Sequence, residues 1–575
     1  MTMLADIHSG MRIRALGIPT LVASLFVLLA PPASAAPIHV NCDAGGNLQN
    51  KINAAHGGST ILVKGTCEGL LSVGSKSLII RGDPKATLDG QDAGTTFSVN
   101  ATGKTVTLVD LVVTNGRTTG RGGGIFVDGG TLKLIRTTVR GNEVLGSQYS
   151  YGGGISIQGS GSLSLTSSRV TGNRALTEPA AGFAYAYGGG IYAEVPVALT
   201  DTTVSNNTAR ATSNDEFAYA YGGAVTAGAL TVSGSTFETN IGRATGHAQF
   251  AYVYGGALEV GSVTLTGSTV SGNRGLAISD TSFAYVYGGG ADIGGGATLT
   301  GSTVKGNVAS STAGDFAVTN GGGISATGAV TLEHSSANAN VAVAAGGAGY
   351  GTASGGGIYH FSGDLVLRRS TVGRNSVSGT SSSSTAEGDG GGILSSDSLV
   401  VSNSTVASNT ASGAATPGTA KTGSAIGGGI DATDVNLTAA TVAANTATAS
   451  GDATAAQGGG LSALTLSTKA SILAGNHAAS GQDCHASTTT HGHNLVLHPG
   501  GCLPSPAGSD ITGQPAKLGQ LQPNGGPTQT MAIPATSPAF NAIRRAACPV
   551  QFDQRGVHRP QGTRCDIGAY ERKVG

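Results

Sequence analysis

Two short stretches of the chain hold residue types that metal binding or acid–base chemistry requires. The densest acidic group is Asp83, Asp89 and Asp92, followed by Asp110. Grouped carboxylates are common calcium ligands, so a calcium site is one interpretation of this stretch. The second stretch is His491-Gly492-His493, whose imidazoles suit metal binding or proton transfer. Structural roles outweigh both interpretations, and we predict no catalytic residue, no metal site and no cofactor.

The remaining carboxylates do not gather into a recognisable active site. Glycoside hydrolases need two or three carboxylates on one face, and polysaccharide lyases need an acidic calcium site beside a basic side chain. Here single acids fall at different points of their repeats: Asp201, Asp292, Asp315, Glu333 and Asp364. This scatter argues against a polysaccharide-cleaving enzyme.

An aromatic motif recurs in four consecutive repeats and is the strongest candidate for ligand binding. The copies are Phe183-Ala-Tyr-Ala-Tyr187, Phe217-Ala-Tyr-Ala-Tyr221, Phe250-Ala-Tyr-Val-Tyr254 and Phe283-Ala-Tyr-Val-Tyr287. The candidate binding residues are Tyr185, Tyr187, Tyr219, Tyr221, Tyr252, Tyr254, Tyr285 and Tyr287. Exposed, stacked tyrosines offer an apolar body and a polar tip to a glycan or a surface protein. Buried, they only pack a corner of the core.

In a β-strand, side chains alternate between the two faces, so the sequence spacing predicts whether the tyrosines are exposed or buried. Counting by twos from Tyr187 through the glycines places the tyrosines on the same side as Ile191. We therefore expect the aromatic side chains to be buried. A corner at the glycines would reset this parity and expose them instead.

These residues are positioned by a glycine-rich repeat of about 33 residues, which is the dominant feature of the chain. The eleven glycine runs begin at Gly122, Gly152, Gly188, Gly222, Gly255, Gly288, Gly321, Gly355, Gly390, Gly427 and Gly458. A fixed period of this length is typical of a solenoid, in which each unit buries its apolar face only by stacking on the next. We expect one long rod and not several separate cores.

One unit shows what kind of solenoid is expected. In residues 152–173, Ile155 and Ile157 alternate with a serine, and Leu163 and Leu165 do the same. Such period-2 runs between Gly and Ser turns predict three short strands per coil and no helix. The predicted fold is therefore all-β, a right-handed parallel β-helix with disulfide-stapled caps.

An asparagine follows each glycine run by some 18 to 21 residues. The set is Asn142, Asn173, Asn206 or Asn207, Asn240, Asn273, Asn307, Asn340, Asn375, Asn409, Asn445 and Asn476. An amide can bond both the backbone and the next amide along a stack. We assign this column to structure, as an amide ladder, over the alternative of ligand binding.

The repeat resembles that of polymorphic outer-membrane proteins, a family of bacterial surface β-helices. The closest copy is Gly222-Gly223-Ala224-Val225 with Phe237-Glu238-Thr239-Asn240, followed by Gly255 to Leu258 with Val270 to Asn273. Most copies have Val where that family has Phe. The resemblance implies a surface-exposed β-helix. Autotransporters of that family end in a membrane barrel, and this chain lacks a terminal series of alternating ten-residue strands.

The two ends carry signs of export. Arg12 and Arg14, an apolar run from Leu21 to Ala30 and the small residues 33–36 make a signal-peptide pattern, and no transmembrane segment is expected after cleavage. Six cysteines lie outside the repeats, and we pair neighbours as Cys42–Cys67, Cys484–Cys502 and Cys548–Cys565. Disulfides fit an oxidising compartment. The residues from Leu48 to Ala55 predict a short helix that covers the open N-terminal end.

The last ninety residues closely resemble the choice-of-anchor Q domain of bacterial surface β-helix proteins. The matching motifs are Gly525-Gly526-Pro527-Thr528, Ser537-Pro538-Ala539, Asp553-Gln554-Arg555-Gly556, Arg559-Pro560 and Cys565-Asp566-Ile567-Gly568-Ala569-Tyr570-Glu571. In that family a sorting signal often follows, whereas only Arg572 to Gly575 remain here. We expect Arg555, Asp553, Asp566 and Glu571 to pair and close the end of the rod.

Together these features predict four regions: 1–36 signal peptide, 37–115 N-terminal cap and first coils, 116–480 repeats, and 481–575 C-terminal domain. Lys+Arg and Asp+Glu are both 32, so nothing basic favours a nucleic-acid partner. The expected function is a secreted or cell-surface adhesion or scaffold module that binds a glycan or a surface protein, with outer-membrane association as one location. The alternative is a polysaccharide lyase or hydrolase on the same fold.

Overall fold

The computed structural model of the chain describes residues 36–418 and 421–573. The expected signal peptide therefore lies, apart from Ala36, outside the described residues. Residues 37–575 form one compact unit. No helix among the described residues is long and apolar enough to cross a membrane.

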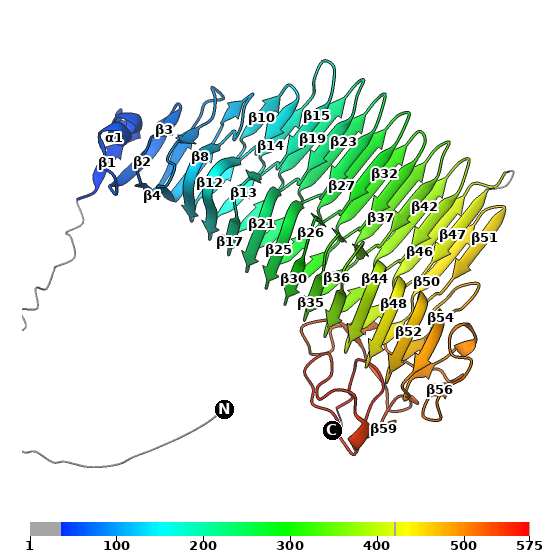
Figure 1. Cartoon of the computed structure of the whole chain (residues 1–575). Coiled ribbons are helices and arrows are strands. Elements are labelled where there is room, and N and C mark those ends of the chain that lie inside the picture. Colours follow the sequence, from blue (N-terminus) through cyan, green and yellow to red (C-terminus); the bar gives the residue numbers. More distant parts are fainter. Residues whose placement is uncertain (1–35, 419–420, 574–575) are drawn as a thin grey trace, which may run out of the picture. The chain divides into compact units, whose positions relative to one another are not determined.

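Each repeat forms one coil of a parallel β-solenoid (Figure 1). The coil that begins at Gly188 contains β16 (Ile191–Ala193), β17 (Val197–Thr200), β18 (Thr203–Ser205), β19 (Thr208–Ser213) and β20 (Ala218–Tyr221). Each strand pairs in parallel with its equivalent in the next coil, so that Ile191 lies opposite Val225. The prediction of an all-β parallel solenoid with like residues in register is confirmed.

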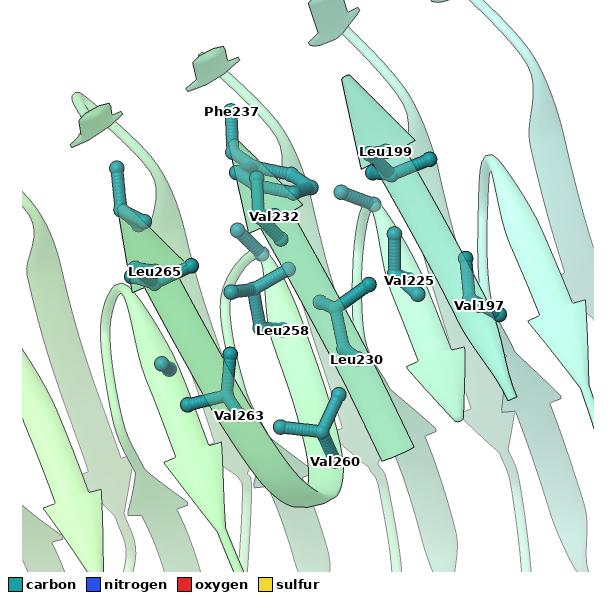
Figure 2. Packing of buried hydrophobic residues seen from close by; sticks show 14 of the residues in the cluster. Val197, Leu199, Val225, Leu230, Val232, Phe237, Leu258, Val260, Val263 and Leu265 are labelled. Carbon is teal, nitrogen blue, oxygen red and sulfur yellow. The ribbon is translucent and has the colours of Figure 1, made fainter. Parts of the chain in front are cut away.

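The first strands of each coil belong to one continuous sheet of 35 strands, which we call sheet A. The coil of Gly188 contributes three strands to it, whereas the coil of Gly222 contributes two, β21 (Val225–Ser233) and β22 (Thr236–Glu238), because its first two strands are continuous. The side chains of sheet A fill the main core. Figure 2 shows Leu199, Val232 and Leu265 at equivalent positions of successive strands, and their exposures are 1%, 1% and 3%. Burial of each such aliphatic side chain contributes about 1.5 to 3 kcal/mol. Stacked columns of these residues hold the coils in register.

The other two strands of each coil form two additional sheets, so the expected count of three strands per coil is wrong. Sheet B consists of β7 (Arg117–Thr118), β10 (Glu143–Gly146), β14 (Arg174–Thr177), β19, β23 (Ile241–Gly246), β27 (Arg274–Ser279), β32 (Val308–Ala313), β37 (Val341–Gly346), β42 (Ser376–Ser381), β46 (Thr410–Ala415) and β50 (Thr446–Ser450). Sheet C consists of β11 (Tyr149–Tyr151), β15 (Ala184–Tyr187), β20, β24 (Ala251–Tyr254), β28 (Ala284–Tyr287), β33 (Ala317–Asn320), β38 (Gly351–Ser354), β43 (Ala386–Asp389), β47 (Thr422–Ile426) and β51 (Ala453–Gln457).

Sheets B and C pack face to face as a thin two-layer extension, which we call the fin. Its interior holds a second core, composed mainly of alanine, that includes Ala184, Ala186 and Ala211 at 0% exposure. Facing Cα atoms of β46 and β47 approach within 8 Å, closer than the usual sheet spacing of about 10 Å. A Cβ at Gly413 would lie 1.9 Å from the carbonyl oxygen of Ser424. Small inward residues are therefore what allows the layers to meet.

The N-terminal end is closed as expected. The helix α1 (Leu48–Ala54) begins after Asn47, whose side chain accepts the backbone N–H of Asn50. Leu48 and Ile52 are buried against the first coils, so the helix covers apolar surface that the next coil would otherwise cover. The Cys42–Cys67 disulfide links the segment before the helix to β2 (Thr60–Glu68).

The C-terminal residues first extend sheet A and then fold back along the solenoid. The strands β54 (Cys484–Thr490) and β55 (Leu495–Val496) pair with the preceding coil, and the predicted Cys484–Cys502 and Cys548–Cys565 disulfides are both present. The chain then packs on the side of sheet A. Gln554 Nε2 donates to Ser370 O at 3.1 Å. Its Oε1 accepts from Thr405 Oγ1 at 2.6 Å.

The predicted charge network forms in this C-terminal segment, but its location differs from the expectation. Arg555 pairs with Asp553 at 2.7 Å, Arg559 pairs with Glu571 at 3.3 Å, and Asp566 accepts the backbone N–H of Arg572. These groups lie beside the last coils and not over the end of the rod. The reason is the small residues that sheet A presents there, which leave room for a covering segment.

Candidate ligand-binding site

The outer face of sheet C carries two columns of tyrosines, which we call the tyrosine wall. The inner column, next to the glycine corner, is Tyr151, Tyr187, Tyr221, Tyr254 and Tyr287. The outer column is Tyr149, Tyr185, Tyr219, Tyr252 and Tyr285. The structure thus brings all eight predicted tyrosines together and adds Tyr149 and Tyr151.

The expectation that these aromatics are buried is wrong. In β15 and β20 the alanines point into the fin and are fully buried, while the tyrosines point outward and are partly exposed. The glycine corner accounts for the difference. Gly188 and Gly222 have φ values of 58° and 52°, in a region that side chains rarely occupy, and the turn there resets the alternation.

The tyrosine rings stack along the rod, and this decides what they can offer a ligand. Ring centroids of successive tyrosines lie 4.5 to 5.3 Å apart, with planes within 2 to 10° of parallel. Each ring in the middle of a column has both faces against its neighbours. The wall therefore presents ring edges and hydroxyl groups to solvent, and a sugar ring has no free face to stack on there.

The hydroxyl groups of the wall stay protonated over the physiological range. Burial raises the pKa of Tyr252 and of Tyr287 to about 12, and it raises the pKa of Tyr221 still further. Neutral phenols donate and accept hydrogen bonds. The wall is thus a regular array of neutral hydrogen-bonding tips set on an apolar base.

A third aromatic column borders the wall toward the edge of the fin. It consists of Phe183, Phe217, Phe250, Phe283, Phe316 and Tyr350, with centroid spacings of 4.4 to 5.4 Å. Phe183 and Tyr350 at its two ends are each 39% exposed. The column widens the apolar surface around the tyrosine tips.

The two ends of the inner column differ. At the first end the guanidinium of Arg121 lies 3.9 Å from the centroid of the Tyr151 ring and pairs with Glu194 at 3.3 Å. At the other end Tyr287 is followed in register by Asn320 and then Ser354. Asn320 is only 8% exposed at this position, and Tyr359, after burial and Tyr285, also raises the pKa of Tyr287.

Carboxylates line the corner beside the inner column, and the sequence interpretation missed their alignment. Glu259 and Asp292 occupy the same position of successive repeats and lie opposite each other in register. Burial raises the pKa of Asp292 to about 7, and burial together with repulsion from Asp292 raises that of Glu259 to about 7. The expectation that Asp292 stands alone is therefore wrong.

A second pair of carboxylates lies further along the same corner. Burial, then repulsion from Asp431 and Glu387, raises the pKa of Asp389 to about 8, and burial raises that of Asp431 to about 6. The signal for Glu259, Asp292 and Asp431 was present in the sequence, since each is the second residue after its glycine triplet or Gly-Gly-Ala. It becomes visible only when the repeats are aligned on that triplet.

The other residues considered for chemistry have structural partners. Asp110 makes a two-point contact with Arg136 at 2.7 and 2.8 Å, and Asp89 accepts from the amide of Asn115. His491 contacts Ser467 at 3.2 Å. Within residues 36–418 and 421–573, no three His, Cys, Asp or Glu side chains are grouped as a metal site would need.

The asparagine column is a continuous amide ladder, as predicted. Asn240 Nδ2 donates to Asn273 Oδ1 at 3.0 Å and to Val204 O at 2.9 Å, and the contacts recur from coil to coil. Both Asn240 and Asn273 are fully buried. Asn207, and not Asn206, belongs to the ladder. Every amide hydrogen-bonding group in the column is used by the solenoid itself.

Comparison with known proteins adds no relative. No protein-family model, no curated protein and no solved structure matches this chain.

Proposed function

We propose that this chain is an exported bacterial surface protein, a non-enzymatic adhesion or scaffold module that binds glycans or surface proteins through the tyrosine wall. The observation that carries the proposal is the wall itself, in which ten tyrosines stack in two columns on one face, Tyr149 exposed and the others partly exposed. Contiguous apolar surface of this kind marks binding sites on soluble proteins.

Three further features support export and a surface location. The N-terminal sequence has a signal-peptide pattern, the repeats resemble those of polymorphic outer-membrane proteins, and the C-terminal motifs resemble the choice-of-anchor Q domain. Three disulfides suit an oxidising compartment. Fractionation of cells into medium, outer membrane and periplasm tests this location.

The mode of binding follows from the stacking. Because ring faces are covered within the columns, a glycan would lie across the ring edges and bond to the phenol hydroxyls. A glycan array with the purified mature chain tests the proposal, with Tyr185→Ala and Tyr219→Ala as loss variants. Tyr219→Phe keeps the stack but removes one hydroxyl, so weaker binding of this variant supports the edge-on mode. The proposal is contradicted if the chain binds no glycan on the array and also binds no surface protein.

A second candidate function, cleavage of polysaccharides, is favoured by one observation. The aligned carboxyls of Glu259 and Asp292, with both pKa values near 7, resemble the proton-sharing pairs that enzymes use. Assays for reducing sugars and unsaturated uronides on pectin, alginate and hyaluronan test it. Turnover that disappears in Asp292→Asn establishes the enzyme, and binding without turnover favours the adhesion module.

A further inference from the structure

An open cleft of about 350 Å³ lies between sheet A and the C-terminal segment packed on its side. One wall is formed by the ends of three neighbouring strands, β35 (Val330–Glu333), β40 (Leu365–Arg368) and β44 (Ile393–Ser402), and by the turns that follow β40 and β44. The other wall is residues 550–552. Clefts that hold small ligands measure about 300 to 1,000 Å³, so this cleft has room for a small molecule.

Two adjacent arginines line the cleft. Arg368 ends β40 with an exposed side chain and makes no ion pair within the part of the chain that the structure describes. Arg369, in the turn after it, donates from Nη1 to His334 Nε2 at 3.3 Å, which uses one of its several N–H donors. Neighbouring guanidinium groups repel each other and attract an anion, so this wall favours a negatively charged ligand.

The acid that lines the cleft does not neutralise these arginines. Glu333 Oε1 lies 3.2 Å from His334 Nδ1. Because His334 Nε2 accepts from Arg369, its Nδ1 carries the proton that is donated to Glu333. Among the described residues Glu333 makes no ion pair with either arginine of the cleft. A positive charge therefore remains unpaired beside Glu333.

A buried amide completes the polar wall. Asn403 follows β44 at the turn position that Arg369 occupies one coil earlier, so their backbones are about 4.8 Å apart along the rod. Asn403 is 4% exposed, and its Nδ2 donates to Phe552 O at 2.8 Å. This bond fixes the orientation of the amide, and in residues 36–418 and 421–573 the buried Oδ1 finds no hydrogen-bond partner. A buried acceptor without a donor is unfavourable, which favours a ligand with a hydroxyl group at this position.

The wall contributed by the C-terminal segment includes an aromatic ring. The guanidinium carbon of Arg369 lies 5.9 Å from the centroid of the Phe552 ring. Such a ring offers apolar contact area to the C–H groups of a sugar. Two cations, an unsatisfied acceptor and an aromatic side chain thus meet in one cleft.

We propose that this cleft binds an acidic sugar, in which a carboxylate lies beside free hydroxyl groups. The carboxylate pairs with Arg368 and Arg369, a hydroxyl donates to Asn403 Oδ1, and the ring packs against Phe552. Guanidinium groups suit a carboxylate because they can bond both of its oxygens. A neutral sugar lacks the anion that the arginines attract, and a small carboxylate lacks the hydroxyl that the amide accepts.

Binding in this cleft is a second activity, beyond the proposed binding at the tyrosine wall, and does not depend on it. The cleft consists of sheet A and the C-terminal segment, whereas the wall belongs to sheet C. Tyr219→Phe should therefore leave binding in the cleft unchanged, and Arg368→Gln should leave binding at the wall unchanged.

Ligand-observed NMR titrations with the full mature chain at low ionic strength test the proposal. The two acidic sugars are D-glucuronic acid and N-acetylneuraminic acid, which distinguish a uronic from a sialic source. Glucuronamide keeps the hydroxyls but has an amide in place of the carboxylate, and acetate keeps the carboxylate without hydroxyls. We expect at least one acidic sugar to bind about tenfold more tightly than both of these matched compounds.

Four variants locate the binding. Arg368→Gln and Arg369→Gln should each weaken binding of the preferred acidic sugar about fivefold or more. Asn403→Gly, which tolerates the φ of 51° at that position, should weaken binding of the sugar but not of acetate. Arg169→Gln removes an exposed arginine of β13 (Arg169–Thr171), also in sheet A, and is the matched control that should change nothing. Because Arg368 is exposed, Arg368→Gln should keep the thermal stability of the wild type.

The proposal is overturned if neither acidic sugar binds, or if the wild type and Arg368→Gln bind them equally. It is also overturned if glucuronamide or acetate binds as tightly as the preferred acidic sugar, since the carboxylate or the hydroxyls would then play no part. Equal losses in Arg169→Gln and Arg368→Gln would show a general attraction of anions to basic side chains and no site.

Discussion

Asp483 Oδ1 accepts both hydrogen bonds that Asn476 directs along the rod, from Nδ2 at 2.9 Å and from the backbone N–H at 3.2 Å. Every earlier asparagine makes the same two bonds to the next asparagine of the ladder. Asn476 has no asparagine after it, and a carboxylate takes that place. Its second oxygen, Oδ2, accepts from the backbone N–H of His498 at 2.7 Å. A buried carboxylate thus ends the amide ladder.

Replacement of this terminal acceptor should loosen the last coils. Asp483→Ala leaves the donors of Asn476 and His498 without an acceptor inside the protein, at a cost of about 2 to 4 kcal/mol. Asp483→Asn keeps the bonds to Asn476 but turns an NH₂ group toward His498, and a smaller loss is expected. Because solenoid stability is local, hydrogen exchange in β53 (Ile472–Ala474) should report it while β26 (Thr269–Ser271) stays protected. Uniform loss of protection along the rod would contradict this account.

Stability should fall as pH rises through the range of the aligned acids. The carboxyl pKa values of Asp292 and Glu259 are about 7 in the folded chain, above their ordinary values of 3.8 and 4.5. Between pH 4 and 7 the unfolded chain therefore releases protons that the folded chain retains, and the folded state loses stability as pH rises. The expected loss is on the order of 2 to 4 kcal/mol, complete slightly above pH 7.

Thermal unfolding of the wild type and of Asp292→Asn across this range measures the effect. The amide cannot ionise, so the variant should show a flatter dependence on pH and higher stability at pH 8. An equal slope in both proteins would mean that other groups control it.

The phenols of the inner column should resist ionisation. Burial raises the pKa of Tyr187, Tyr221 and Tyr254 above the range reached by Tyr252, whose pKa is about 12. A spectrophotometric titration should therefore show some tyrosines ionising only when the chain unfolds in strong alkali. Tyr221→Phe should remove one group from that late step and none from the early one. A single titration near pH 10 for all phenols would show that the columns are not stacked.

The lateral position of the C-terminal segment depends on small residues in sheet A. Ala407 and Ala443 contact Leu521 and Met531 of that segment. In an earlier coil the position equivalent to Ala407 is occupied by Lys305, whose side chain is exposed. Ala407→Lys should therefore displace the segment and make residues after 515 sensitive to protease.

Ser271→Lys is the matched control for this substitution, because the same position is open to solvent in its coil. It should leave the cleavage pattern unchanged. Protection of the segment in Ala407→Lys would mean that its hydrogen bonds to the coils, such as those of Gln554 and Gln529, are enough to hold it in place.

The period of the glycine motif was enough to predict the solenoid, its register and the amide ladder, since stacking forces equivalent residues together. The fin was not predictable in the same way. Its interior positions, such as Ala184 and Ser213, are too small to stand out as a hydrophobic stripe, so only sheet A was recognised as strands. The hydrophobic pattern reports large side chains, whereas this second core is built from small ones.

The orientation of the tyrosines depended on backbone geometry that residue spacing does not reveal. Counting by twos across Gly188 assumed an unbroken strand, and the positive φ at that residue reverses the count. The pairing of Glu259 with Asp292 was within reach of the sequence, because both follow their glycine triplets by the same number of residues.

The direction of the amide ladder also constrains how this rod could lengthen or shorten during evolution. All its amides point the same way, from the backbone N–H of Gly116 at the donating end to the carboxylate of Asp483 at the accepting end. Duplication or deletion of a whole repeat between these residues would rejoin donor to acceptor without loss. A deletion that removes Asp483 would instead leave an exposed set of donors at the cut. Gene rearrangements that preserve the last repeat should therefore yield folded proteins of different lengths.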